Sequence, residues 1–227
     1  MIPAAVIFDF NGTLSDDEQL LAELFHEIFA EVGIDVPASL YFDEFVGYSD
    51  AEICRRLLAR FGRADEDGLA ERLIERRTEL YLEAQRTRPT VRPEAAELVR
   101  QVAARVPVAI ASGAARREIE TVLEASGLRD LFGVLVCLEN VANGKPDPEG
   151  YLLALDLLNR DRRSPVAAAD VLVFEDSEQG LKAATAAGMR CVMVAGPTPV
   201  ERLTAAEGIV NALDWSIPVV RELFDAD

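Results

Sequence analysis

The sequence predicts an α/β protein with a doubly wound parallel sheet and an all-helical domain inserted after the first strand. Five short apolar runs lack polar alternation, which is typical of strands covered on both faces. Helical patterns alternate with these runs, which favours parallel strands joined by helices. Residues 15–86 break that rhythm, because they contain helical patterns and no convincing strand.

The apolar runs predict strands at 4–8, 107–111, 134–137, 170–174 and 190–194. The patterns between them predict helices near 94–105, 115–126, 147–158 and 178–187. Gly127 and Gly188 fall where two of these helices should stop in a left-handed residue. The tail, 208–227, is expected to add a short strand, a loop and a helix.

The insert is expected to begin with a helix that Asp16 caps and that runs to about Glu31. Its apolar stripe consists of Leu20, Leu21, Leu24, Phe25 and Ile28. Further helices are expected at 50–60 and 66–84, and 87–94 reads as a linker with Pro93 at a helix start. The predicted organisation is therefore a core of residues 1–14 and 87–227 and a helical domain of residues 15–86.

Composition excludes several classes of function. A net charge of −17 argues against nucleic-acid binding, because such a surface repels phosphate backbones. No stretch approaches membrane-spanning length, and the N-terminus lacks the basic region of a signal peptide. Three scattered cysteines without a CxxC motif favour a reducing cytoplasm over a disulfide framework or a zinc site. We expect a cytoplasmic protein that is a monomer or a weak homodimer.

Four loops follow predicted strands, at the edge where open α/β sheets bind ligands. The first holds Asp9 and Asn11. A carboxylate at Asp9 could attack phosphorus and form an aspartyl-phosphate. A divalent cation would have to offset the repulsion between the two anions, and hard oxygen ligands suit Mg²⁺. The alternative is a strand that ends in an Asn-Gly turn.

The other three loops each carry a weaker signal. Ser112 and Gly113 could form an anion seat at a helix start, or Ser112 could only cap that helix. Lys145, one of two lysines, could neutralise both Asp9 and a phosphoryl group, or it could be a solvated turn residue. Glu175 and Asp176 could bind a metal, or they could only cap the next helix and complement its dipole. Their common position after strands favours one shared site.

The segments that hold these loops resemble a known family. They are FDFNGTLSDDE (8–18), IASGA (110–114), GKPDPEGY (144–151) and VFEDSEQGLKAATAAGM (173–189), with FVGYSDAEICRRLL (45–58) in the insert. They are similar to the haloacid dehalogenase superfamily, in particular to its beta-phosphoglucomutase-like phosphatase and phosphohexomutase branch. The resemblance spans nearly the whole chain. It implies a Rossmann-like core with a small helical cap.

The resemblance also implies roles for single residues. Asp9 would be the nucleophile, and the main-chain carbonyl of Asn11 would join Asp9 and Asp176 around Mg²⁺, with Glu175 close by. The phosphoryl oxygens would be held by Ser112, the amide of Gly113 and Lys145.

The cap, residues 15–86, would close over the substrate and exclude water. Glu18 and the loop from Gly47 to Asp50 would face the leaving group. The implied ligand is a small-molecule phosphate ester.

Asn11 departs from the family pattern, in which an aspartate at this position protonates the leaving oxygen and then activates water. Loss of such a group typically costs about 10²–10⁴ in rate. Three explanations stay open. The chain is an engineered trap of a normal enzyme, a natural enzyme with another acid or an easily displaced leaving group, or a natural binding protein with little turnover.

Other branches of the family fit less well. Leu21 and Asp50 stand where phosphoglucomutases tend to carry a histidine and an arginine, and an acid at 50 would repel a second phosphate. The dehalogenase branch needs no acid-base group at position 11, but it usually has an aromatic residue there. A Schiff-base hydrolase of phosphonoacetaldehyde is rejected, since residues 15–86 contain no lysine. His26, the one histidine, is expected to be structural or on the surface.

The expected function is therefore Mg²⁺-dependent hydrolysis of a small phosphorylated metabolite, such as a sugar phosphate. The non-enzymatic alternative is a metabolite-binding protein that keeps the fold and the metal seat.

Overall fold

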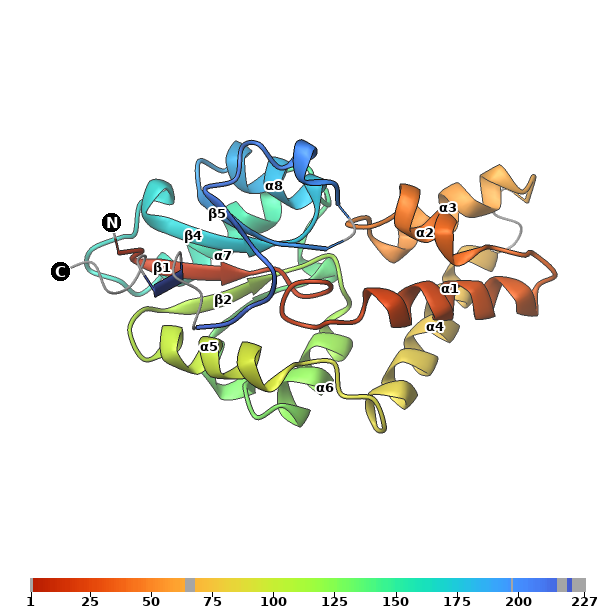
Figure 1. Ribbon diagram of the computed structural model, residues 1–227, viewed down its shortest axis with the longest axis horizontal. Coiled ribbons are helices and arrows are strands. Elements are labelled where there is room, and N and C mark those ends of the chain that lie inside the picture. Colours follow the sequence, from red (N-terminus) through yellow and green to blue (C-terminus); the bar gives the residue numbers. More distant parts are fainter. Residues whose placement is uncertain (1, 64–67, 197, 216–219, 222–227) are drawn as a thin grey trace.

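The computed structural model describes residues 2–63, 68–196, 198–215 and 220–221. Its centre is a six-stranded parallel sheet of order β3-β2-β1-β4-β5-β6 (Figure 1). The strands are β1 (Ala5–Phe8), β2 (Val108–Ala111), β3 (Val134–Val136), β4 (Val171–Glu175), β5 (Arg190–Val194) and β6 (Gly208–Val210). Strands β2 and β3 are added on one side of β1, and strands β4 to β6 on the other side. The loops after β1, β2 and β4 therefore meet at the point where the strand order changes direction.

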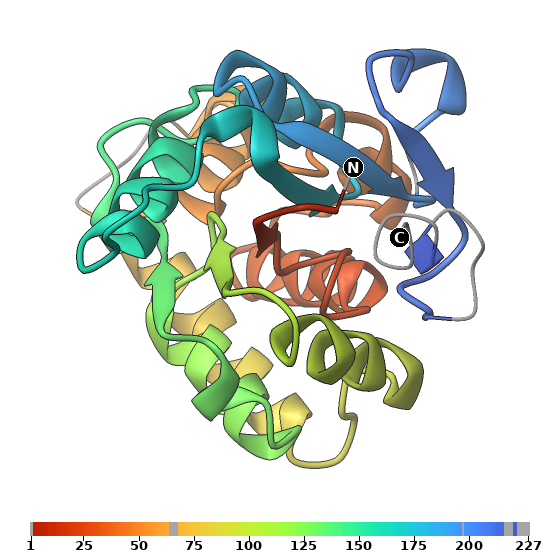
Figure 2. The ribbon, with the colours of Figure 1, turned by 90° about the vertical axis from the view of Figure 1, so that its left-hand side faces the viewer.

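Alternate residues of the central strand pack against different helices. Val6 and Phe8 join one apolar cluster, with residues of α5 (Pro93–Ala103) and α6 (Arg116–Ala125). Ala5 and Ile7 join a second cluster, with residues of α7 (Glu149–Asn159) and α8 (Glu178–Ala186). Figure 2 shows these two helix pairs on opposite faces of the sheet. Coverage of both faces explains why the strands are apolar along most of their length.

The described helices that follow β1 lie beyond the carboxyl ends of the strands (Figure 1). They are α1 (Glu18–Glu31), α2 (Ala38–Glu44), α3 (Asp50–Arg60) and α4 (Leu69–Gln85). Buried residues of α1, such as Phe25, belong to the same apolar cluster as Phe8 of β1. Single turns of 3-10 helix at Arg129–Leu131, Leu138–Asn140, Ala168–Asp170 and Val200–Arg202 complete the described elements.

The doubly wound α/β fold class and the predicted strands, including the short strand of the tail, are confirmed. Gly127 and Gly188 are left-handed, with φ of 66° and 74°, and Pro93 begins α5. The three cysteines are buried and free. Among the described residues, no helix is both long and apolar enough to cross a bilayer. Apart from residues 220–221, which are helical, the predicted tail helix lies outside the described residues, as do the first two residues predicted for 66–84.

Two details of the insert were predicted wrongly. Asp16 does not cap α1, because the helix begins at Glu18 and the exposed Asp16 forms an ion pair with Arg92 instead. Helix α2 was not predicted at all. It has seven residues, of which only Leu40 and Tyr41 are buried, so its sequence carries no repeating apolar stripe.

Candidate active site

The side chains at the carboxyl edge of the sheet converge on Lys145. Its Nζ contacts Asp9 Oδ1 and Glu175 Oε1, and both carboxylates are buried. Burial alone would lower the pKa of Lys145, but the two carboxylates outweigh it and the pKa lies above its usual value. The ammonium therefore stays charged. This position rules out the alternative of a solvated turn lysine.

Three carboxylates gather around this ammonium. One oxygen each of Asp9, Glu175 and Asp176 lies within 4.8 Å of the others. Burial raises the pKa of Asp9 to about 7, although Lys145 opposes the shift. Burial, and then the charge of Glu18, raises the pKa of Asp176 well above its usual value. One lysine does not balance this many acids, so the cluster has the charge and the oxygen donors that suit a divalent cation.

Asp176 has the free ligand atom. Its Oδ1 accepts a hydrogen bond from Thr13 Oγ1 at 3.3 Å, but its buried Oδ2 has no hydrogen-bond partner among the described residues. A buried unpaired carboxylate oxygen is costly, and a bound cation would satisfy it. Ser177, not Asp176, caps α8, with its Oγ accepting from the amide of Gly180 at 3.0 Å. Neither acid of the pair is therefore the cap of α8.

Glu175 is held more tightly than its neighbour. Its Oε1 accepts from Tyr151 at 2.9 Å as well as from Lys145. Its Oε2 accepts from the amides of Asp176 and Ser177 at 2.9 and 3.0 Å. Burial raises the pKa of Glu175, but Lys145 and these hydrogen bonds outweigh it, so its pKa lies below the usual value. The arrangement fixes Glu175 as the anchor of Lys145.

A glycine makes room for this anchor, and the prediction from the sequence did not include it. A Cβ on Gly180 of α8 would lie 1.7 Å from Glu175 Oε1, whereas one on Gly150 of α7 would lie 3.8 Å from its nearest neighbour. We expect Gly180→Ala to lower the free energy of unfolding by about 1–3 kcal/mol through overpacking. Gly150→Ala should raise it by up to about 1 kcal/mol, because alanine favours helix. Urea denaturation measures both, and equal effects would contradict the role of Gly180.

A small cavity of about 60 Å³ lies between these loops and the helical segment. The predicted site residues that line it are Asp9, Asn11, Glu18, Gly47, Asp50, Ser112, Gly113, Lys145 and Asp176. Glu175 lies directly behind Lys145. Ser112 does not cap the next helix, which begins at Arg116 after Ala115 without a side-chain cap. The structure thus brings together residues that are up to 167 positions apart in the chain, from Asp9 to Asp176.

The loop of the helical segment rests on the core beside the cavity. A Cβ on Gly47, which has a φ of 84°, would lie 2.7 Å from Ser177 Cβ. Gln179 Nε2 donates to Tyr48 Oη at 3.3 Å across the same contact. Glycine at 47 therefore permits both the left-handed backbone and the close approach.

Asn11 is bound to a carboxylate that was not predicted from the sequence. Its Nδ2 donates to Asp17 Oδ2 at 2.9 Å, and Asp17 also accepts from Ser15 Oγ at 2.7 Å and Tyr81 Oη at 2.6 Å. Burial raises the pKa of Asp17 to about 6. Asp17 is fully buried and does not line the cavity, so it joins the Asn11 loop to α4. Nothing in the sequence distinguishes it from its exposed neighbour Asp16.

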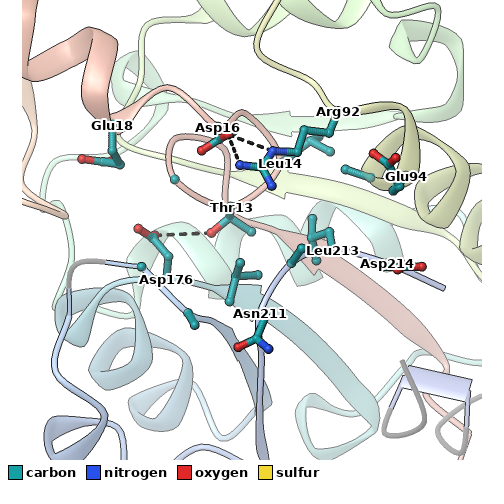
Figure 3. A pocket seen from close by; sticks show the side chains of 16 residues that line it. Thr13, Leu14, Asp16, Glu18, Arg92, Glu94, Asp176, Asn211, Leu213 and Asp214 are labelled. Carbon is teal, nitrogen blue, oxygen red and sulfur yellow. Dashed lines mark hydrogen bonds and ion pairs between the residues drawn. The ribbon is translucent and has the colours of Figure 1, made fainter. Parts of the chain in front are cut away.

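Glu18 belongs to two cavities. It lines the small one and a second cavity of about 450 Å³ on the other side of Asp176, where Thr13 and the Asp16–Arg92 pair form the wall (Figure 3). Burial, and then the charge of Asp17, raises the pKa of Glu18 to about 8. Its Oε2 is buried, and within the part of the chain that the structure describes it has no hydrogen-bond partner. Glu18 is therefore a second unsatisfied acid beside Asp176.

His26 lies away from this site. Its side chain is 52% exposed, and its Nδ1 lies 2.9 Å from the carbonyl oxygen of Val36. It does not line either cavity described above. This agrees with a surface histidine.

Comparison with known proteins identifies the family. The model of the haloacid dehalogenase-like hydrolases matches residues 3–188. A phosphorylated carbohydrates phosphatase of Thermotoga maritima is 34% identical over 186 residues, which are 82% of this chain and 82% of that protein. A (DL)-glycerol-3-phosphatase of Arabidopsis thaliana is 30% identical over 228 residues, which cover 94% of this chain and 91% of that protein.

A solved structure has the same architecture. A mutant of CbbY from Rhodobacter sphaeroides in complex with xylulose-(1,5)bisphosphate is 28% identical, with a TM-score of 0.79 over 93% of this chain and 95% of that one. Family match, relatives and fold agree, and the chain belongs to the haloacid dehalogenase-like hydrolase family.

Proposed function

We propose that this protein is a Mg²⁺-dependent phosphatase of small phosphorylated metabolites, with Asp9 as the nucleophile. The observation that carries the proposal is the buried cluster in which Lys145 bridges Asp9 and Glu175 while Asp176 keeps an unpaired oxygen. The phosphatases among the relatives support the same reaction class.

One group of residues in the cluster would hold the metal ion. The carboxylates of Asp9 and Asp176 and the main-chain carbonyl of Asn11 would hold Mg²⁺, with Glu175 close by. The bound ion would polarise the phosphoryl group and offset the charge of the attacking carboxylate.

Asp9 attacks phosphorus and the bond to the ester oxygen breaks. The leaving oxygen takes its proton from water, because Asn11 cannot supply one, and an aspartyl-phosphate remains until a second water cleaves it. Lys145, Ser112 and the amide of Gly113 bind the phosphoryl oxygens and stabilise the charge that develops on them.

Residues 15–86 act in this proposal as a cap over a core of residues 1–14 and 87–227. The cavity of about 60 Å³ is far smaller than the roughly 300–1,000 Å³ of typical ligand sites. In this proposal the loop from Gly47 to Asp50 moves away from the core to admit substrate and returns when the cap closes. In the closed arrangement, Glu18 and this loop face the leaving group.

Release of phosphate from a panel of phosphomonoesters tests the proposal. We expect hydrolysis that depends on Mg²⁺ and stops after chelation. Asp176→Asn should lower the rate at least about 10- to 100-fold, because it removes a charged metal ligand. Asp170→Asn, directly before the start of β4, is the matched control and should leave the rate unchanged.

Asn11 favours one alternative, a metabolite-binding protein with negligible turnover. In that case Mg²⁺ and inorganic phosphate would bind in a calorimetric titration, while no ester of the panel would be hydrolysed. That combination of results would replace the phosphatase by the binding protein.

A further inference from the structure

A buried ion cluster joins the helical segment to the core beside the cavity. Arg77 of α4 is 2% exposed, and its Nη1 donates to Glu118 Oε2 of α6 at 2.7 Å. Its Nη2 donates to Asp50 Oδ2 of α3. Thr78 Oγ1 donates to the other oxygen of Glu118 at 2.7 Å. One guanidinium thus ties a residue of the cavity wall, Asp50, to a helix that covers the sheet.

A contribution to folding stability is a poor explanation for burying these charged groups together. Buried ion pairs cost desolvation energy that their attraction often only just repays. Here the Nε of Arg77 is also buried, and none of the described residues accepts a hydrogen bond from it. An apolar contact between α4 and α6 would join the two helices without these costs. The cluster therefore points to a role for the one member that reaches the cavity.

That member is Asp50. Its side chain is 14% exposed, it lines the small cavity, and among the described residues Arg77 is the one side chain that donates to it, at Oδ2. An ionised carboxylate only accepts hydrogen bonds and has room for about four. Its remaining acceptor capacity suits a hydroxyl group.

The charge of the cluster favours the same ligand. Asp50 and Glu118 contribute two negative charges and Arg77 one positive charge, so the cluster is net negative beside the cavity. A second phosphate or a carboxylate on the leaving group would be repelled there, whereas a neutral hydroxyl would not.

We propose that Arg77, anchored by Glu118, is a positioning residue that fixes Asp50 as the hydrogen-bond acceptor for a hydroxyl of the leaving group. The site then selects polyhydroxylated monophosphates over unsubstituted esters and over bisphosphates. This inference rests on the proposed function, since it assumes that a phosphate ester binds in the cavity.

Binding of two matched esters tests it. Glycerol 3-phosphate carries hydroxyl groups and ethyl phosphate carries none. Affinities for both are measured by calorimetry with Mg²⁺ in Asp9→Asn, which prevents turnover. Adding Asp50→Ala should lower the affinity for glycerol 3-phosphate about tenfold or more, which is the effect of losing one hydrogen bond to a charged group. The affinity for ethyl phosphate should change less than twofold. Glu52→Ala, in the same helical turn but outside the cavity, is the matched control and should change neither.

Arg77→Met should lower the affinity for glycerol 3-phosphate as much as Asp50→Ala does, and Glu118→Gln should lower it by a smaller factor. Thermal unfolding of each variant checks the fold, and the Asp50→Ala result decides if Arg77→Met does not fold. Fructose 1,6-bisphosphate should bind relatively better to Asp50→Ala than to its parent.

The inference is overturned if Asp50→Ala leaves glycerol 3-phosphate unchanged, if it weakens both esters equally, or if neither ester binds. Failure of the proposed function is a separate result. Hydroxyl-dependent binding in Asp9→Asn, together with no phosphate release when Asp9 is intact, would remove the phosphatase and leave the role of Asp50 standing.

Discussion

Replacing Asn11 by aspartate is expected to raise the rate of phosphate release by about 10²–10⁴, the usual contribution of one acid-base group. The amide of Asn11 cannot donate its proton to a leaving oxygen or take one from water. A carboxyl at this position could do both. Steady-state release of phosphate, compared between the chain and Asn11→Asp on the same ester, measures the difference.

The hydrogen bond between Asn11 and Asp17 suggests a second variant for this experiment. Asn11 Nδ2 lies 2.9 Å from Asp17 Oδ2, so Asn11→Asp places two carboxyl groups at hydrogen-bond distance. Two buried carboxylates so close cannot both ionise readily. The double variant Asn11→Asp/Asp17→Asn moves the carboxyl to position 11 and keeps an amide–carboxyl pair. We expect it to be as fast as the single variant and more stable to urea.

Asp17→Asn alone is the control. Like the double variant, it removes the carboxylate of Asp17, but it adds no acid at position 11. The rate of phosphate release should therefore not rise. If Asn11→Asp folds and its rate stays within a few-fold of the parent, Asn11 does not limit turnover. The interpretation of Asn11 as the brake would then be wrong.

The positions of the reactive loops were predictable, because each follows a strand and parallel strands end at one edge. The apolar runs that precede Asp9 and Glu175 therefore placed both acids at that edge from the sequence alone. The order of the strands in the sheet then brought Ser112 and Lys145 beside them. The family resemblance added the roles that we propose for these residues.

The supporting residues were not predictable in the same way. Asp16 and Asp17 are adjacent and identical in type, yet one is exposed and the other accepts hydrogen bonds from Asn11 and Tyr81. Arg77 lies in an arginine-rich helix, and only the packing of α4 on α6 shows that this arginine is buried against Glu118. Such choices depend on contacts between distant segments, which local patterns do not encode.

Asp9→Asn is expected to lower phosphate release at least about 10⁴-fold, because it removes the nucleophile. The fold should survive. Asn keeps the shape of the side chain, and the change removes one buried acid from a cluster that already holds Glu175 and Asp176. The free energy of unfolding should therefore stay equal or rise. Urea denaturation in the absence of Mg²⁺ checks this, and a large loss of stability would show that Asp9 has mainly a structural role.

The most direct test of Asp9 as the nucleophile is the intact mass of the protein after incubation with acetyl phosphate and Mg²⁺. The acetate leaving group needs little protonation, so the first step should proceed although position 11 is an amide. The second step lacks its base, so the phosphoryl adduct should accumulate. The account predicts a mass increase of one phosphoryl group in the chain, a shorter-lived adduct in Asn11→Asp and none in Asp9→Asn. No adduct in the chain or in Asn11→Asp, or an adduct that persists in Asp9→Asn, would contradict it.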